Sequence, residues 1–302
     1  MNKGSVNIDD VQYFFPIENR DIDKPDSIVE ALIEEKQILH GEATVAIQLG
    51  LNFLGAIVDV GCHIGTHTLY LASYGMHEFI GIDACKESID CLNLSIKKNG
   101  FKNIKAVHAV ASHSNFKCAF STRTHEDSQL WQDVGFWKSL WRRKEIKRMQ
   151  TQTVDEIVGD THCGVINVDV NGYELAVLHG AQNTIVRDLP NLVVRFDPQY
   201  KHLDMILDFL HELEYTAYYV APIDFNSPKP QLLEIREPCT HCDPTYILCF
   251  PNGYDTVNRF HIVPPTTSSS SEKESGPNQK QLLVDILTQG AVNVEIVTEK
   301  GS

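Results

Sequence analysis

From Ala56 onward, short apolar runs alternate with amphipathic runs, and this rhythm constrains the fold more than any other feature of the chain. Short continuous apolar runs are typical of buried strands, whereas apolar residues three and four apart indicate helices. The strand-like runs are AIVDV, EFIGID, NIKAVHAVAS, FKCAFST, GVINVDV, NLVVRFD, TAYYVAP and TYILCF. The alternation predicts an α/β fold with a doubly wound, mostly parallel sheet that helices cover on both faces.

The amphipathic runs between these strands predict the helices. We expect helices over 66–73, 86–99, 153–158, 173–188 and 200–215. Gly75 provides a left-handed exit from the first of them, and Asn99 with Gly100 ends the second. An earlier helix is expected to begin at Asp26 or Ser27, because a short side-chain oxygen accepts a free backbone N–H there.

The composition along the chain suggests three parts. Residues 1–26 are acidic and interrupted by Pro16 and Pro25, so we expect a loosely packed lead-in. Residues 27–263 form the main domain, with an insertion at 123–148. Residues 264–302 begin with a Ser-rich polar linker that lacks the apolar residues needed to fold, and they end in a short tail.

The insertion contains all three tryptophans of the chain and a cluster of Lys and Arg residues. Trp137 and Trp141 are four residues apart, so on a helix they share one face. Three interpretations stay open. The segment is a helix that buries its aromatic face, a lid over an acceptor pocket, or a basic amphipathic helix for an anionic partner or a membrane surface.

Charge and hydropathy exclude several classes of protein. The net charge of −14 argues against a nucleic-acid surface, which needs clustered Lys and Arg, so no nucleic-acid partner is expected. No apolar run is long enough to cross a membrane, and the N-terminus does not resemble a secretory signal. We therefore expect a cytoplasmic protein. The oligomeric state stays open.

The eight cysteines are scattered and several lie in apolar runs, which is typical of reduced, buried thiols. Cys239 and Cys242 form the one CxxC pair, and Cys249 or His261 could complete a zinc site with them. No second pair stands at zinc-finger spacing, so we predict no metal.

The first turn of the predicted sheet is the best candidate for a ligand site. In this fold, ligands bind beyond the carboxyl ends of the strands. Gly61 and Gly65 follow the strand AIVDV, and we expect them to clear the backbone for a ligand. The helix over 66–73 then directs its N–H groups toward the ligand. Asp83 ends the next strand, where a carboxylate can accept hydrogen bonds from ribose hydroxyls.

The spacing of this turn discriminates between nucleotides. The pattern DVGCHIG is neither the G-x-G-x-x-G of dinucleotide sites nor a Walker loop, although an ordinary glycine-rich turn remains an alternative. With the later acid, it resembles motif I of the class I S-adenosylmethionine-dependent methyltransferases. That resemblance implies a Rossmann-like methyltransferase fold.

A second stretch, TVDEIVGDTHCGVINVDVNGYELAVLHGAQNTI, resembles the FkbM family of methyltransferases, which carry a KIDVEGxE…vLxGA block after an LDel helix. The resemblance covers roughly residues 55–250. It implies S-adenosyl-L-methionine as cofactor and the hydroxyl of a small molecule, or of a glycan or lipid-linked acceptor, as the methyl acceptor. The cofactor-binding residues it implies are Asp59, Gly61, Gly65, Thr66, Asp83, Ala109 and Val110.

The candidate catalytic residues are Asp169 and Glu174, which lie in the block that resembles the family, and His63, which lies beside the glycine turn. Asp169 is the candidate for the base or for orienting the acceptor. Alternatively, it caps the next helix or binds the amides of the turn at Gly172. Glu174 lies in the first turn of a helix, where the helix dipole favours a carboxylate in any case. His63 and His67 flank the glycine turn, and either can titrate near neutral pH or simply bind backbone.

The chain departs from the family pattern at several positions. Asn167 stands where the family usually has Lys, and Asn171 where it usually has Glu. The Ala-Asn of the glycine turn is Cys62-His63 here, and the Glu-Pro after the second strand is Asp83-Ala84. These departures motivate the alternative function, a methyltransferase-fold module that binds or regulates without catalysis. An NAD-linked oxidoreductase is a third hypothesis, which the glycine spacing disfavours.

Overall fold

The computed structural model describes most of the chain up to Val263. The described residues are 2–8, 10–17, 29, 32–33, 41–51, 54–75, 77–121, 129–131, 146–197, 203–220, 231–235, 245–254 and 261–263. The predicted linker and tail, Trp137 and Trp141, and the Cys239–Cys242 pair lie outside these residues. The division of the chain at residues 26 and 263 therefore stays a prediction.

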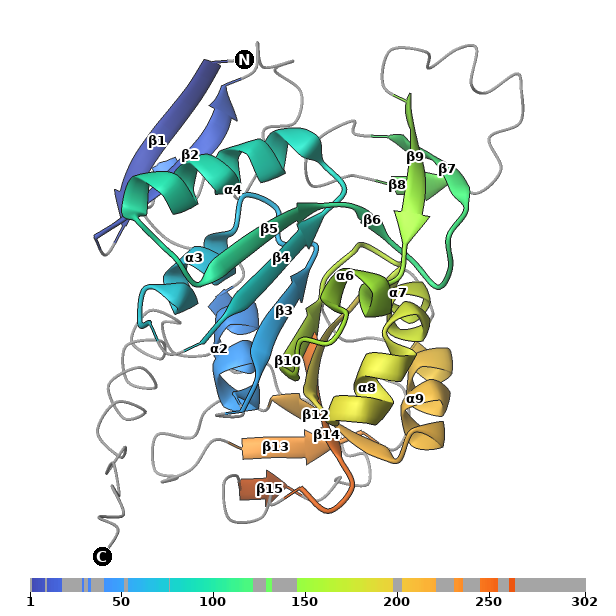
Figure 1. Cartoon of the computed structure of the whole chain (residues 1–302). Helices are drawn as coiled ribbons and strands as arrows, with labels where there is room; N and C mark the ends of the chain where they lie inside the picture. The colour runs from blue at the N-terminus through green and yellow to red at the C-terminus, as the bar shows by residue number, and fades with distance from the viewer. Residues whose placement is uncertain are drawn as a thin grey trace, which may run out of the picture.

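The main body is a nine-stranded sheet with the order β15-β13-β12-β14-β11-β10-β3-β4-β5 (Figure 1). Its strands are β3 (Ala56–Val60), β4 (Phe79–Asp83), β5 (Ile104–His108), β10 (Cys163–Val168), β11 (Asn191–Phe196), β12 (Tyr215–Val220), β13 (Gln231–Glu234), β14 (Thr245–Pro251) and β15 (His261–Val263). The half from β11 to β5 is parallel, whereas β14 pairs antiparallel with both β11 and β12. The sheet is thus mixed, and its parallel half confirms the predicted doubly wound, Rossmann-like fold.

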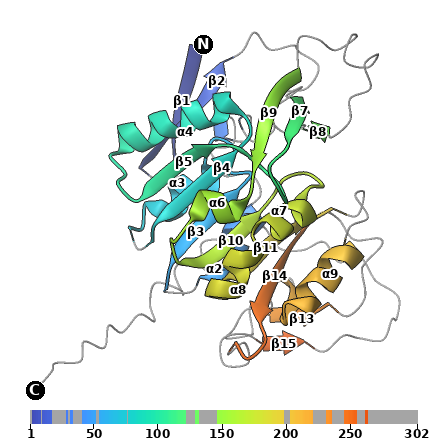
Figure 2. The same ribbon diagram turned by 45° about the vertical axis from the view of Figure 1, so that its right-hand side comes forward.

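Helices cover both faces of this sheet (Figures 1 and 2). One face carries α2 (Gly41–Gly50), α3 (Thr66–Ala72) and α4 (Lys86–Asn99), and the other carries α6 (Val154–Val158), α7 (Glu174–Gly180), α8 (Gln182–Asp188) and α9 (Leu203–Glu212). Successive residues of a strand point to opposite faces, so Val165 packs with α2 and α3 while Ile166 packs with α7, α8 and α9. Both faces are apolar because both are buried.

The parallel register determines where the site lies. Val60 of β3 is the partner of Ile82 in β4 and of Val168 in β10. All three residues stand at or next to the carboxyl end of their strands. The segments that follow these strands therefore meet at one edge of the sheet.

The expectation of a loosely packed lead-in is wrong for residues 2–17. They form an antiparallel hairpin of β1 (Asn2–Ile8) and β2 (Val11–Ile17). Tyr13 is fully buried, and it packs in one apolar cluster with Leu92 of α4. Asn99 also accepts from the Gln12 N–H and donates to the Gln12 carbonyl, at 2.8 Å each. The alternating apolar residues of VQYFF make the buried face of β2.

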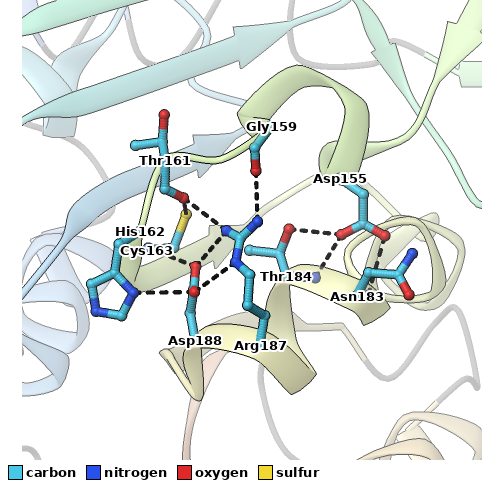
Figure 3. A network of polar contacts seen from close by, with 9 residues as sticks. All are labelled: Asp155, Gly159, Thr161, His162, Cys163, Asn183, Thr184, Arg187 and Asp188. Carbon is cyan, nitrogen blue, oxygen red and sulfur yellow. Dashed lines mark hydrogen bonds and ion pairs between the residues drawn. The ribbon is translucent and has the colours of Figure 1, made fainter.

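The single helix predicted over 173–188 is two helices, α7 and α8, with Ala181 between them. Asp155 of α6 accepts hydrogen bonds from the Asn183 and Thr184 N–H groups, at 3.1 and 2.8 Å (Figure 3). In a continuous helix, these two N–H groups would instead donate to carbonyls of the preceding turn. Capping by a carboxylate from another element therefore starts a new helix here.

Figure 3 also shows polar contacts at the amino end of β10, which is the end of the strand opposite to the site. Arg187 donates to both carboxylate oxygens of Asp188, at 2.7 Å each. Asp188 also accepts from the Cys163 N–H at 2.9 Å. The hydrogen bonds from Arg187, above all, hold the pKa of Asp188 well below its usual range. This cluster anchors α8 to the sheet and is structural.

A second, four-stranded sheet leaves the main one after β5, with the order β6-β9-β7-β8. Its strands are β6 (Val110–Ala111), β7 (Lys117–Ser121), β8 (Gln129–Trp131) and β9 (Ile146–Gln152). The predicted strand NIKAVHAVAS is therefore interrupted at Ala109. The described ends of the insertion are strands, because β7 pairs antiparallel with β8 and with β9, and the rest of the insertion lies outside the described residues.

The six described cysteines are free and buried, as predicted for that part of the chain. Within the described residues, no cluster of three metal-ligating side chains occurs. The same residues contain no helix that is both long and apolar enough to cross a membrane.

Candidate functional site

The turn after β3 lies at the carboxyl edge of the sheet, as predicted. Gly61, His63 and Gly65 all have a positive φ, at 88°, 53° and 83°. The N–H groups of Gly61 and Cys62 both donate to the Ile82 carbonyl, at 2.8 and 3.1 Å. The turn is therefore fixed against the end of β4 before α3 begins.

The two glycines are required for a reason that differs from the predicted one. A Cβ on Gly61 would overlap the backbone carbonyl oxygen of Asp169, and a Cβ on Gly65 would overlap the side chain of Leu92. The space beside both glycines is thus filled by the protein. Gly61 lets β3 approach the loop after β10, and Gly65 lets α3 pack on α4. The expectation that these glycines also let a ligand approach the backbone stays a prediction.

Asp83 stands at the end of β4, half-buried beside this turn. Its Oδ2 accepts from the His63 N–H at 2.9 Å, and its Oδ1 accepts from the Cys85 N–H at 2.6 Å. Two backbone donors therefore hold the carboxylate in one orientation. A carboxylate oxygen can accept more than one hydrogen bond.

An apolar patch adjoins Asp83 where the chain leaves the main sheet. The Ala109 N–H donates to the Asp83 carbonyl at 3.0 Å. Val110 is buried there, and Ala84 and Tyr173 pack against the cluster that it forms with Cys118. Burial, above all, raises the pKa of the Tyr173 phenol. The predicted residues Ala109 and Val110 are therefore brought beside Asp83, and Tyr173 is a neighbour that the sequence did not indicate.

Asp59 lies deeper, under the first turn of α3. Its carboxylate accepts from Thr68 Oγ1 at 2.6 Å and from Asn167 Nδ2 at 2.8 Å. Thr66 is also buried at the start of α3. Asn167 thus bonds the acid of the glycine motif through a neutral amide.

The two predicted histidines have different surroundings. His67 shares a hydrogen bond of 2.7 Å between its Nδ1 and Thr44 Oγ1, which links α3 to α2. His63 is buried in the turn, and its backbone N–H binds Asp83. His67 therefore has a structural contact, whereas His63 lies directly beside the Asp83 carboxylate.

The side chain of Asp169 does not cap the next helix or bind the turn amides. Its Oδ1 accepts from Arg195 Nη1 at 3.1 Å, and its Oδ2 accepts from the Tyr246 hydroxyl at 2.6 Å. The Arg195 and Asp169 side chains are 20% and 18% exposed. Burial alone would lower the pKa of the Arg195 guanidinium, but Asp169 and Tyr246 reverse this and hold it above the usual value.

Glu174 binds the turn amides instead. Its Oε1 accepts from the Val170 and Gly172 N–H groups, at 3.2 and 3.0 Å, and the residue is 4% exposed. Burial is the largest influence and raises the pKa of this carboxyl, although the backbone donors partly oppose it. Asn171 within the turn has φ 51°, a left-handed conformation that Asn tolerates well. Asn171 therefore fits the backbone of this turn.

Comparison with known proteins identifies the family. The protein-family model described as the methyltransferase FkbM domain matches residues 59–217, more than half of the 302 residues. The chain belongs to the FkbM methyltransferase family. The match runs from Asp59 through Asp83, Asp169 and Arg195, so it includes the candidate site and confirms the resemblance seen in the sequence.

Several of the solved structures that match are methyltransferases. The FkbM methyltransferase from Methylobacillus flagellatus KT has 16% identity and a TM-score of 0.43, over 66% of this chain and 44% of that one. This chain thus spans less than half of that relative. A TehB-like SAM-dependent methyltransferase from Corynebacterium glutamicum has 13% identity and a TM-score of 0.40, covering 74% and 93% of the two chains. A SAM-dependent O-methyltransferase from Thermotoga maritima has 12% identity and a TM-score of 0.38, over 75% of this chain and 71% of that one. No curated protein matches.

Proposed function

We propose that this FkbM family member is an S-adenosyl-L-methionine-dependent O-methyltransferase, acting on a hydroxyl of a small molecule or of a glycan or lipid-linked acceptor. The observation that carries the proposal is the Asp83 carboxylate, which the His63 and Cys85 N–H groups orient at the tip of β4. A carboxylate held in a fixed orientation at the end of this strand suits the two hydroxyl donors of a ribose.

The residues around Asp83 fit the rest of the cofactor. Ala84, Val110 and the half-buried Tyr173 form an apolar neighbourhood beside the carboxylate, which suits a purine ring. When bound, S-adenosyl-L-methionine supplies the methyl group and its leaving group, so the protein mainly positions the reactants and handles the acceptor proton.

We assign the acceptor to the carboxyl ends of β10 and β11, beside Asp169 and Arg195. Both oxygens of Asp169 already accept hydrogen bonds, one from a guanidinium and one from a phenol. This arrangement favours the role of orienting the acceptor, through Arg195 and Tyr246, over that of a free base. His63, beside Asp83 in the turn, remains the next candidate for the base.

The test is turnover with methyl-labelled S-adenosylmethionine across hydroxylated acceptors, including free sugars, lipid-linked glycans and cyclic diols. We expect label in at least one acceptor and a loss of transfer in Asp83→Ala. The matched control is Asp90→Ala, which removes an exposed carboxylate paired with Lys86 on the adjacent helix α4. Cofactor binding without transfer to any acceptor would contradict the proposed enzymatic activity. It would favour the alternative, a methyltransferase-fold module that binds or regulates without catalysis.

A further inference from the structure

The Asp59 carboxylate is 2% exposed, and its two hydrogen-bond donors are both neutral. They are the Thr68 hydroxyl at 2.6 Å and the Asn167 amide at 2.8 Å. Within the part of the chain that the structure describes, no Lys, Arg or His pairs with Asp59. A buried carboxylate normally has a cationic partner, because low-dielectric surroundings penalise an isolated charge.

Asn167 adds a second acceptor at the same place. The residue is 1% exposed, and its Oδ1 has no hydrogen-bond partner among the described residues. Its amide thus presents an open acceptor next to a carboxylate. A Lys at position 167 would instead bring a positive charge to Asp59. With Asn167, this buried region carries a carboxylate and an open amide acceptor, and neither has a cationic partner among the described residues.

This region lies directly under the turn of the proposed cofactor site. Asp59 is two residues before Gly61, and Thr68 belongs to the first turn of α3. Burial is the main reason why the pKa of Cys62 in the turn is raised, and the negative charges of Asp83 and Asp59 raise it further. The field of Asp59 thus extends into the turn itself.

We propose that Asp59, left without a cationic partner by Asn167, makes the site selective for the cationic sulfonium of S-adenosylmethionine over the neutral thioether of S-adenosylhomocysteine. The inference rests on the proposed function. The two ligands share the adenosine and amino-acid parts, so contacts to those parts cancel in the comparison. A negative charge under the turn, in surroundings of low effective dielectric, acts on the difference that remains, and it favours product release.

The test compares the calorimetric affinities of the two ligands for the full chain, with no acceptor present. Asp59→Asn removes the charge, and Asn167→Lys gives it a cationic partner. In both variants we expect the preference for S-adenosylmethionine over S-adenosylhomocysteine to fall about tenfold. Asp90→Asn, which removes an exposed charge, is expected to leave the ratio unchanged. A purely structural role of Asp59 would weaken both ligands equally.

The possible failures are distinguishable. Unchanged ratios in folded Asp59→Asn and Asn167→Lys would overturn the selectivity while leaving the methyltransferase proposal intact. Absence of binding of either ligand to the folded wild-type chain would overturn the proposed function and, with it, this inference. If Asp59→Asn does not fold, the affinity ratio in Asn167→Lys tests the selectivity by itself, because this variant retains the Asp59 carboxylate.

Discussion

Tyr246 donates a hydrogen bond of 2.6 Å to Asp169 Oδ2, which joins the antiparallel strand β14 to the loop after β10. Arg195 on β11 binds the other carboxylate oxygen at 3.1 Å. Three segments that are far apart in the sequence therefore meet at one carboxylate. Asp169 is consequently part of the structure at this edge of the sheet as well as a neighbour of the proposed acceptor.

Asp169→Asn is expected to affect both stability and turnover. It leaves the half-buried Arg195 guanidinium without its carboxylate, so the free energy of unfolding should fall by about 1–3 kcal/mol. Turnover should fall about 10²-fold or more, while affinity for S-adenosylhomocysteine stays within a few-fold. Urea denaturation, an acceptor assay and calorimetry measure the three quantities.

Tyr246→Phe is the matched control, because it removes one hydrogen bond to Asp169 and leaves the ion pair. We expect it to cost about 1 kcal/mol. Unchanged turnover in Asp169→Asn would move the acceptor role elsewhere, with His63 next. Unchanged stability would contradict the ion pair with Arg195.

Gly61→Ala tests the close approach of β3 to the loop after β10. The new Cβ would overlap the Asp169 carbonyl oxygen, so the variant should be destabilised by several kcal/mol or fail to fold. Gly75→Ala is the control, because Gly75 also has a positive φ, at 72°, but no atom within 4 Å of a new Cβ. Its cost should be only the backbone strain, about 1–2 kcal/mol. Equal losses in chemical denaturation would contradict the assigned contact.

The buried Glu174 predicts a specific pH dependence. Its pKa in the folded protein is raised above the ordinary 4.5, so the folded state favours the protonated form. The stability gained in this way is fully present below the unfolded pKa and is lost as the pH rises through the folded pKa. Relative to Glu174→Gln, which does not titrate, the wild type should become less stable as the pH rises from about 4 toward neutrality. Urea denaturation of both proteins across this range measures the difference, and a constant or rising difference would contradict the raised pKa.

The two ends of the chain should respond differently to truncation. Removing residues 1–17 exposes the apolar cluster that Tyr13 and Leu92 share, so the product should be insoluble or unstable. A chain ending at residue 263 should fold and bind cofactor, because the Ser-rich segment that follows lacks the composition of a core. Solubility and thermal unfolding compare the two truncated chains, and the reverse pattern would contradict both expectations.

Local patterns were sufficient for the elements that form the parallel half of the sheet. The turn at Gly61, the carboxylate at Asp83 and the helix ending at Gly100 depend on residues that are close in the sequence. The β1–β2 hairpin was missed although Val11, Tyr13 and Phe15 alternate, because two prolines near it suggested loose packing. The division between α7 and α8 was not predictable locally, because its cause is a carboxylate on α6.

The candidate site shows the same limit. Arg195 gave one weak signal, as a charged residue inside the otherwise apolar run LVVRF, whereas nothing around Tyr246 indicated a site. Their meeting with Asp169 depends on the antiparallel pairing of β14 with β11, where Arg195 and Tyr246 are register partners. Long-range pairing of this kind is not encoded in local periodicity. The packing role of Gly61 was missed for the same reason, since its neighbour is the backbone of a distant loop.

Calorimetric titration of the full wild-type chain with S-adenosylhomocysteine, alongside NAD and the Asp83→Ala variant, tests the central claim most directly. We predict saturable binding of S-adenosylhomocysteine, no binding of NAD, and an affinity about 10- to 100-fold lower in Asp83→Ala, because hydrogen bonds to a charged group are lost. Asp83→Ala also removes the acceptor of the His63 and Cys85 N–H groups, so its folding without ligand is verified first by thermal unfolding. Absence of binding to the folded wild-type chain, or undiminished binding by folded Asp83→Ala, would contradict the account.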